Sequence, residues 1–233
     1  MIDWHSHILP NMDDGSRNVA ESVNLLKILK EQCVDTVIAT PHFYATTESK
    51  ESFLQRRSQC YQKLKEEIFS EEDLPHILLG AEVKYYSGIS AREDLRDLCI
   101  EGTRLLLLEM PFSEWTEYTL RELNILSRSK RIVVVLAHIE RYWSLQKADV
   151  WNTLRDNGIL MQVNASFFTG AFTKRKALRL LDDGFVHMIG SDCHGITTRP
   201  PVISSAYDFI HRKFGGEFIA QMQEYAESLL VSY

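Results

Sequence analysis

Two histidines near the start of the chain have the spacing of a metal-binding pair. An apolar run that begins at Ile2 ends in His5-x-His7. Side chains alternate across a β-strand, so residues two apart project from the same face and can reach one ion together. A single histidine is more often a satisfied polar group than a ligand. The pair therefore indicates a metal site only together with the other candidate ligands in the chain.

Further nitrogen and oxygen ligands follow other apolar runs. Each stands at or just after the carboxyl end of a β-like segment, and Asp14 adds an acidic turn after the first one. Imidazole and carboxylate groups without thiolate suit manganese, iron or zinc, and this set is too large for one ion. Two or three ions are expected, and a hydroxide that bridges them would hydrolyse a phosphoester at neutral pH. The candidate metal ligands are His5, His7, Asp14, His42, Glu82, Glu109, His138, Asp192 and His194.

The elements that must position these ligands alternate between β-like and helix-like segments. Helical spacing of apolar residues predicts helices at 18–32 and 51–69, and a short helix around Ala91 to Cys99. Parallel strands with right-handed crossovers close into a (β/α) barrel, whose active site lies at the carboxyl ends of the strands. An open doubly wound sheet is the alternative, but it would not gather ligands from nearly every strand end. The predicted strands are residues 2–5, 35–40, 76–83, 104–110, 132–138, 159–164 and 186–192.

Length, composition and charge narrow the class of protein. The chain has 233 residues, 45% hydrophobic and 25% charged, with a formal net charge of -6. This suits a soluble α/β barrel with residues 1–233 as one domain. The acidic balance disfavours nucleic acid, and the brief basic stretch at 174–179 fits a solvated helix face. No apolar stretch approaches the roughly 20 residues needed to span a membrane, and four cysteines without paired spacing favour a cytoplasmic protein.

Six short motifs occur in a fixed order along nearly the whole chain. They are Asp3-x-His5-x-His7, Thr40-Pro41-His42, Gly80-x-Glu82, Ala137-His138-Ile139-Glu140-Arg141-Tyr142, Ser191-Asp192-x-His194 and Arg199-Pro200-Pro201. Together they resemble the bacterial PHP-type (polymerase and histidinol phosphatase) protein tyrosine phosphatases of capsule and exopolysaccharide loci. The resemblance implies a distorted (β/α)7 TIM-like barrel, the PHP fold, and a metal cluster that uses manganese in many members. It also implies a substrate, phosphotyrosine on a membrane-associated tyrosine kinase that regulates capsule or exopolysaccharide synthesis.

The resemblance also implies a role for each candidate residue. One ion would be held by His5, His7, Glu82 and Asp192, a second by Glu82, Glu109 and His138, and a third by Asp14, His42 and His194. Glu82 would bridge ions, and with Arg141 and Arg199 it forms the expected catalytic set. The arginines match the family's phosphate-binding residues, a role that suits guanidinium because its fork meets phosphate oxygens bidentately. A surface ion pair is the alternative for either arginine, and Asp3 is expected to orient a ligand histidine.

Other mechanisms stay open at this level. Cys193 and Arg199 have the Cys-x5-Arg spacing of cysteine-dependent tyrosine phosphatases, but Cys193 lies between two candidate ligands and is expected to pack behind the last strand. A small-molecule phosphatase of the histidinol-phosphate type usually has a histidine where this chain has Asp14. A nuclease is disfavoured by the acidic balance. A non-catalytic regulatory partner of the kinase would not need the two arginines.

Two peripheral regions and the oligomeric state are less constrained. Family chains commonly finish with an asparagine-led helix, whereas residues 221–233 begin Gln-Met-Gln, so the packing of this end is not predicted. The loop at 43–52, with Phe112, Trp115 and Trp143, is a candidate for shaping substrate choice, and ordinary packing is the alternative. The sequence leaves a homo-oligomer open.

Overall fold

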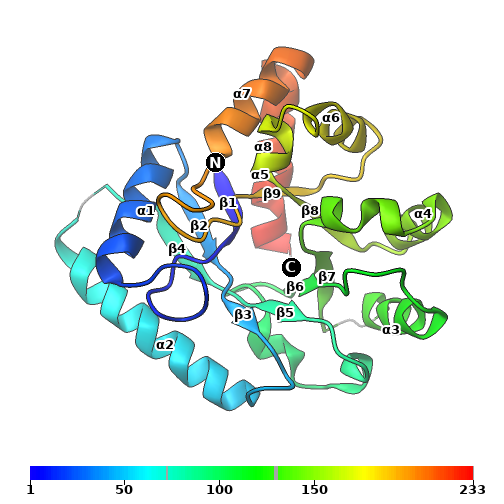
Figure 1. The fold of residues 1–233 in the computed structure, drawn as a ribbon, viewed down its shortest axis with the longest axis horizontal. Helices are drawn as coiled ribbons and strands as arrows, with labels where there is room; N and C mark the ends of the chain where they lie inside the picture. The colour runs from blue at the N-terminus through cyan, green and yellow to red at the C-terminus, as the bar shows by residue number, and fades with distance from the viewer. Residues whose placement is uncertain (72, 129–130, 233) are drawn as a thin grey trace.

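Parallel strands form the centre of the molecule (Figure 1). The computed structural model describes residues 1–71, 73–128 and 131–232. In this part of the chain the strands pair in the orders β1-β2-β4 and β3-β5-β6-β7-β8-β9. Their bounds are β1 Ile2–Ser6, β2 Thr36–Ala39, β3 His42–Phe43, β4 His76–Leu79, β5 Glu82–Lys84, β6 Leu105–Glu109, β7 Val133–Leu136, β8 Leu160–Asn164 and β9 Met188–Gly190.

Two of the predicted strands are each divided in two by a short break. Thr40-Pro41 separates β2 from β3, and Gly80-Ala81 separates β4 from β5. Proline lacks the N–H that a ladder requires, and pairing resumes beyond the break in the same register, since Ala39 pairs with Leu79 and His42 pairs with Glu82. The two sheet orders are therefore successive parts of one curled sheet, in which β3 and β5 continue the paths of β2 and β4.

The last strand returns to the first. The backbone N–H of Asp192 donates to His5 O at 2.7 Å, and the N–H of His7 donates to Cys193 O at 3.0 Å. Ser6 and Cys193 form a parallel bridge at the same place. The predicted strand segments are confirmed in position, and their order runs around a barrel rather than along an open doubly wound sheet.

Most helices lie around the outside of the strands (Figure 1). Side-chain caps begin three of them, with Asn18, Ser49 and Thr116 each accepting a backbone N–H of the first turn. The short helix predicted around Ala91 to Cys99 is reduced to a 3-10 turn at Leu95–Leu98, in which Leu95 and Leu98 are buried. The helices are α1 Val19–Glu31, α2 Lys50–Glu67, α3 Glu117–Ser127, α4 Ala148–Asp156, α5 Ala165–Thr169, α6 Lys174–Asp182, α7 Ile203–Phe214 and α8 Gly216–Ser232, with 3-10 turns η1 Ile68–Ser70, η2 Ile89–Ala91, η3 Leu95–Leu98, η4 Ile139–Arg141 and η5 Trp143–Leu145.

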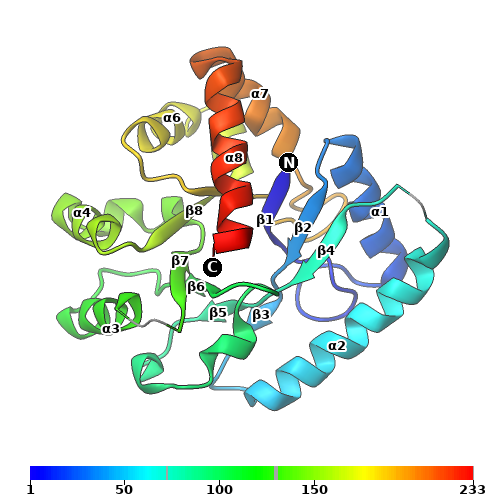
Figure 2. The same ribbon diagram turned by 180° about the vertical axis from the view of Figure 1, so that it is seen from behind.

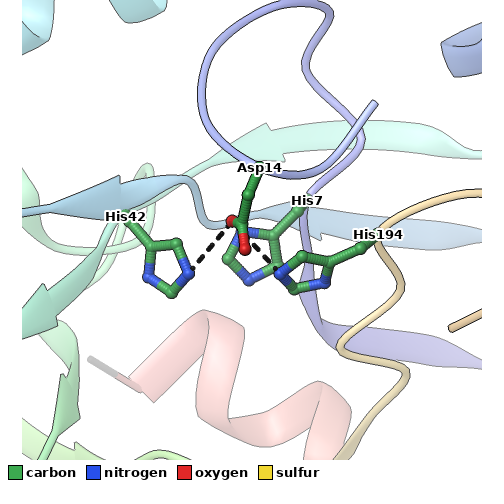
Figure 3. Close-up of side chains that lie close together, drawn as sticks. All are labelled: His7, Asp14, His42 and His194. Atoms are coloured by element: carbon green, nitrogen blue, oxygen red, sulfur yellow. Dashed lines mark ion pairs between the residues drawn. The ribbon is translucent and has the colours of Figure 1, made fainter. Parts of the chain in front are cut away.

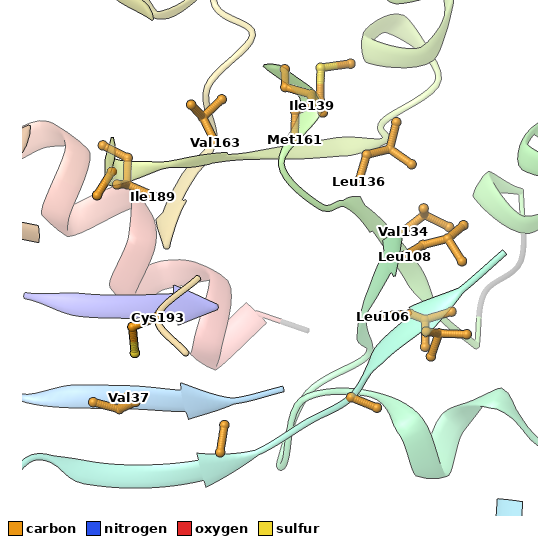
Figure 4. Packing of buried hydrophobic residues seen from close by; sticks show 14 of the residues in the cluster. Val37, Leu106, Leu108, Val134, Leu136, Ile139, Met161, Val163, Ile189 and Cys193 are labelled. Atoms are coloured by element: carbon orange, nitrogen blue, oxygen red, sulfur yellow. The ribbon is translucent and has the colours of Figure 1, made fainter. Parts of the chain in front are cut away.

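The strands are apolar on both faces because both faces are covered. On β6, Leu106 and Leu108 belong to the large cluster that packs against the helices (Figure 4). Leu105 and Leu107 of the same strand belong to a second, smaller cluster inside the barrel. Continuous apolar runs are typical of such doubly covered parallel strands.

The C-terminal helix closes one end of the barrel. Figure 2 shows α8 crossing in front of the strands, and its Ala226 and Leu229 are buried in the same inner cluster as Trp4 and Leu105. The end that the sequence left unassigned therefore packs over the amino ends of the strands. Among the described residues, no helix has the length and apolarity needed to cross a membrane.

An irregularity in β1 separates the two ends of the barrel. Asp3 pairs with Val37 and Ser6 pairs with Ala39, so β1 has one more residue than β2 over this interval. A bulge of this kind changes which side chains face a given surface. As a result Trp4 lies in the inner apolar cluster, while His5 and His7 face the carboxyl end of the barrel.

Candidate metal centre

All the predicted ligands gather at the carboxyl ends of the strands. The loops that follow β1 and β9 supply Asp14 and His194, and the strand ends supply most of the others. Among the described residues, three groups have ligand atoms within 4.8 Å of one another. These groups are His5, His7 and Asp192; His42, Glu82 and Glu109; and His7, Asp14, His42 and His194.

Glu82 is the centre of the arrangement. Its Oε2 lies 3.2 Å from His5 Nε2, 3.3 Å from His7 Nε2 and 2.9 Å from His42 Nδ1. Its other oxygen, Oε1, lies 2.7 Å from His138 Nε2. The side chain is 1% exposed. Glu82 thus presents its two oxygens to different ligand groups, as a bridging carboxylate would.

The remaining ligands lie on either side of Glu82. Glu109 Oε1 is 3.8 Å from His138 Nε2. Asp14 Oδ1 is 3.4 Å from both His42 Nε2 and His194 Nε2 (Figure 3). Both groupings agree with the sets implied by the sequence, with two differences: His7 also reaches the group of Asp14, and His42 reaches that of Glu109.

Hydrogen-bond acceptors beside the Nδ1 atoms of His5 and His7 orient the two rings. His7 donates from Nδ1 to Asp13 Oδ2 at 2.7 Å, and His5 donates from Nδ1 to the side-chain oxygen of Gln162 at 3.1 Å. A carboxylate and an amide oxygen only accept, so in both rings the proton is on Nδ1 and the lone pair is on Nε2. The two Nε2 atoms lie 3.1 Å apart. In the neutral rings two lone pairs then face each other, and a cation between them, either a proton or a metal ion, would satisfy both.

Buried polar atoms without hydrogen bonds also indicate a cation site. In the described part of the chain, His138 Nδ1 and His194 Nε2 are buried without a hydrogen-bond partner, and the 2.9 Å contact between His42 Nδ1 and Glu82 Oε2 lacks hydrogen-bond geometry. A buried unsatisfied polar atom costs about 1–3 kcal/mol. Coordination of an ion would remove this cost for Glu82 and His194. The donor set therefore fits divalent cations that accept nitrogen and oxygen ligands.

The electrostatics of the site also favour positive charge. Burial acts to raise the pKa of Glu82 and Asp192, but the surrounding histidines outweigh it and lower both pKa values. Burial acts to lower the pKa of His7, but Asp13, Asp192 and Glu82 raise it well above its ordinary value. The carboxylates thus draw a proton onto an imidazole, and the same atoms would attract a metal ion.

Asp192 joins the ligand cluster to the two predicted arginines. Its Oδ1 lies 3.4 Å from His7 Nε2, while its Oδ2 accepts from Arg141 and Arg199. Asn164 Nδ2 also donates to Oδ2, at 2.7 Å. Asp192 and Arg199 both have positive φ, 51° and 55°, a conformation that costs energy in non-glycine residues and is typical of functional sites. The structure thus brings the arginines to the edge of the ligand cluster.

The cysteine alternative has no support in the geometry. Cys193 is fully buried and lies in the outer apolar cluster (Figure 4). Burial raises the pKa of its thiol to about 12, whereas a nucleophilic cysteine needs a lowered pKa and access to substrate. Its side chain packs behind the last strand, as the sequence predicted.

Sequence reasoning missed the role of two polar residues that support the candidate ligands. Asp13, the neighbour of Asp14, holds His7, and its backbone partners are Gly15 and His42. Gln162 holds His5, and its amide donates to Asn164 Oδ1 at 2.9 Å, which fixes the amide orientation. A glutamine within the apolar run of β8 was the available signal for this role.

Asp3 does support the site, but through the backbone. Its carboxylate accepts from the backbone N–H of His5 at 3.3 Å and from the N–H and hydroxyl of Ser191. It contacts no imidazole nitrogen in these hydrogen bonds, so the predicted orientation of a histidine ring belongs to Asp13 and Gln162 instead. Asp3 joins the end of β1 to the loop that carries Asp192.

The three candidate substrate aromatics differ in exposure. Trp115 is 6% exposed and packs with Tyr142 and Trp151, at 5.3 Å from each ring centre. Trp143 stacks on Trp151 at 4.5 Å. Phe112 is 70% exposed. Ordinary packing therefore accounts for the two tryptophans, and only Phe112 of the three is well exposed.

Comparison with known proteins gives consistent matches. The family model for capsular polysaccharide synthesis, CpsB/CapC, matches residues 1–230. Tyrosine-protein phosphatase YwqE of Bacillus subtilis is 29% identical over 99% of this chain and 91% of its own length. Tyrosine-protein phosphatase CpsB of Streptococcus pneumoniae is 34% identical over 93% of this chain and 92% of its own length.

Solved structures agree with these relatives. A chain from the crystal structures of YwqE and CpsB, described as unique metal-dependent tyrosine phosphatases, has a TM-score of 0.85 and 27% identity, covering 99% of this chain and 94% of that one. The predicted distorted barrel of the PHP type is thereby confirmed. A putative histidinol phosphatase from Listeria monocytogenes shares the fold, with a TM-score of 0.51 and 15% identity over 84% of this chain and 96% of that one. With a family model matched along 1–230 and relatives aligned over most of their length, this chain belongs to the capsular polysaccharide synthesis CpsB/CapC family.

Proposed function

We propose that this chain is a metal-dependent tyrosine phosphatase that removes phosphate from tyrosines of a bacterial tyrosine kinase in capsule or exopolysaccharide synthesis. The observation that carries the proposal is the convergence of the His5 and His7 lone pairs on Glu82 and Asp192, with two arginines on the far oxygen of Asp192. The names of YwqE and CpsB as tyrosine-protein phosphatases support the same activity.

The proposed ligand sets overlap the three clusters, with His138 in place of His42 beside Glu82 and Glu109. His5, His7, Glu82 and Asp192 would hold one ion, Glu82, Glu109 and His138 a second, and Asp14, His42 and His194 a third. Manganese is the proposed metal because nitrogen and oxygen donors without thiolate suit it, and iron or zinc would accept the same donors. Ions bound there would supply a water nucleophile at neutral pH and offset charge on the phosphoryl group.

The chain's own residues then position the reacting groups. Asp13 and Gln162 hold His7 and His5 in the tautomer that leaves Nε2 free. Arg141 and Arg199 are 38% and 41% exposed at their side chains, so their remaining N–H groups are open to a phosphoryl oxygen. Glu82, Arg141 and Arg199 are the proposed catalytic residues.

The proposed setting is the cytoplasm, where a membrane-associated kinase presents its phosphotyrosines. Cys33, Cys60, Cys99 and Cys193 are all free in the described residues, which suits a reducing compartment. Residues 1–233 are proposed to act as one catalytic domain, in keeping with the family match along 1–230.

The test compares three substrates after metal analysis of the purified protein. Phosphotyrosyl peptide, phosphoseryl peptide and histidinol phosphate are each assayed with excess manganese, and then with the phosphorylated cytoplasmic domain of the kinase. We expect bound metal and turnover of phosphotyrosine well above that of the other two. Preference for histidinol phosphate would instead indicate a small-molecule phosphatase, and no turnover of any phosphoester would favour a regulatory partner.

A further inference from the structure

A cavity of about 400 Å³ lies beside the metal centre. It is formed by η4, α5, the turn that follows α5 and the segment that leads into α7. Its volume falls within the range of about 300–1,000 Å³ that is typical of ligand pockets. The residues that matter for its chemistry are Arg141, Phe167, Thr169, Thr173, Arg199 and Val202.

Asp192 forms the wall between this cavity and the metal ligands. Its Oδ1 faces His7 at 3.4 Å, and its Oδ2 faces Arg141 and Arg199, which line the cavity. A polypeptide whose phosphoryl group lies at the arginines must therefore continue next to the cavity. Because the cavity adjoins the proposed phosphate site, its expected occupant is a part of the substrate polypeptide close to the phosphotyrosine.

Apolar side chains stand among the polar ones that line the cavity, and an exposed ring lies beyond them. Phe167 and Val202 are partly buried and pack against the core. Thr169 and Thr173, which also line the cavity, flank the turn that carries Phe172, and Phe172 is 100% exposed. A single exposed ring is common on protein surfaces, and Phe172 is of interest here because it extends the apolar part of the cavity.

The turn that presents Phe172 is ordered by hydrogen bonds. Gly170 N–H donates to Ser166 O at 3.1 Å, and the Thr173 hydroxyl donates to Phe167 O at 2.8 Å. A side chain at Gly170 would clash with the Thr173 hydroxyl, 2.3 Å from the added carbon. The ring is therefore held at the rim by a tight turn, which lowers the entropy cost of using it as a contact.

We propose that this cavity receives an apolar side chain of the substrate polypeptide adjacent to the phosphotyrosine, with Phe172 as a contact at its rim. The inference rests on the proposed tyrosine phosphatase function and adds to it a preference among phosphotyrosine sequences. The two arginines bind the phosphoryl group, and the cavity binds the side chain next to the phosphotyrosine.

The test uses two phosphotyrosyl peptides that differ only in carrying Leu or Glu beside the phosphotyrosine, on each side in turn. kcat/KM is measured with manganese for the unaltered protein, Phe172→Ser and Thr169→Arg, and each value is divided by that of the same protein on p-nitrophenyl phosphate. Phe69→Ser is the matched control, because Phe69 is 90% exposed but lies on η1, before β4, at the opposite end of the strands. Light scattering of each protein gives its mass.

The unaltered protein is expected to prefer the Leu peptide by about tenfold, as apolar pockets commonly do. Phe172→Ser should reduce this preference to about threefold or less, Thr169→Arg should shift it towards the Glu peptide, and Phe69→Ser should leave it unchanged. If the unaltered protein hydrolyses both peptides equally, this inference is wrong although the phosphatase function stands. If it hydrolyses no phosphotyrosine, the proposed function itself has failed.

Two further outcomes would overturn the inference. Equal losses on p-nitrophenyl phosphate and both peptides in Phe172→Ser would mean that the cavity holds the phosphorylated ring itself. A lower mass of Phe172→Ser with unchanged peptide preference would mean that the rim joins two copies of this chain.

Discussion

The two ends of the barrel are built on the same strands and have opposite chemistry. On β6, Leu105 and Leu107 pack with Trp4 and Leu229 of the inner cluster at the amino end. At the carboxyl end the same strand finishes in Glu109, whose carboxylate faces His138. The apolar end is stabilised by packing of buried side chains against one another. The polar end buries lone pairs and carboxylates that need cations to balance them, so the two ends should respond differently to metal removal and to mutation.

The largest expected effect is on the polar end as a whole. Chelation should abolish phosphatase activity, and manganese should restore it, because the facing nitrogens of His5 and His7 would lose their shared cation. Cys193→Ser, at a fully buried thiol, should retain most activity. Dialysis against chelator followed by assay and metal analysis checks both. Full activity in excess chelator, or loss in Cys193→Ser with metal still bound, would rule out the metal mechanism.

The next effect concerns the carboxylate shared by the ligand groups. Glu82→Gln should lower metal content and reduce kcat on the order of a thousandfold, because one amide replaces a charge that two ions would share. Glu122→Gln is the control, because Glu122 is equally buried, at 2% exposed, but is not a candidate ligand. Its carboxylate accepts hydrogen bonds from the loop at 85–90. Metal analysis and kinetics on both variants give the comparison. Wild-type metal content and turnover in Glu82→Gln would show that Glu82 does not bridge.

The arginines should affect rate and spare the metal. Arg141→Ala and Arg199→Ala should each reduce kcat on the order of a hundredfold, because they meet charge that develops on the transferring phosphoryl group. Arg155→Ala, at a half-buried arginine paired with Asp156, is the control. Bound metal and steady-state kinetics are measured together. Loss of metal in either variant would make that arginine structural, and unchanged kinetics would place it away from the substrate.

At the apolar end the effect should be on stability alone. Leu229→Ala should lower the free energy of unfolding by about 2–4 kcal/mol, because it opens a cavity in the inner cluster. Glu227→Ala, on the exposed face of the same helix, should change it little. Denaturant unfolding gives both values, and kcat measured well below the midpoint should match the unaltered protein. A fall in metal content in Leu229→Ala would show that the two ends are coupled.

The smallest expected effect is a pH dependence from His187. Its Nδ1 accepts the N–H of Met161 at 3.1 Å, and burial lowers its pKa from 6.5 to about 4. The unfolded chain therefore takes up a proton first, so stability is full above pH 6.5 and falls as the pH decreases towards 4. We expect a loss of roughly 1 kcal/mol per pH unit at the start of this range. Unfolding at several pH values should show a shallower slope in His187→Gln, and an unchanged slope would place the titrating group elsewhere.

The sequence was sufficient to predict the strands and the polar residues that gather at their ends, because both signals are local. The runs before Glu109 and His138 are apolar without interruption, and a polar ligand at the end of each run marks the carboxyl edge of the sheet. Parallel strands place these edges on one side of the sheet, and closure into a barrel brings them around one site. The positions of the ligands in chain order therefore predicted their proximity.

The supporting residues depend on contacts that no local pattern specifies. Asp13 and Asp14 are adjacent and chemically alike, yet the first holds the outer nitrogen of His7 and the second faces His42 and His194. Gln162 reaches His5 from 157 positions away in the sequence. Trp115 and Phe112 both follow β6, and only packing against Trp151 distinguishes the buried ring from the exposed one.

The bulge in β1 has a consequence at the level of the gene. Substitutions at Trp4 change the size of one side chain, whereas deletion of a single codon there would remove the extra residue that lets Trp4 and His5 serve opposite ends of the barrel. Because side chains alternate along a strand, the shortened chain could keep either the apolar contact or the ligand pair in place, but not both. The start of this gene should therefore tolerate many missense changes and no in-frame loss of one residue between Asp3 and Ser6.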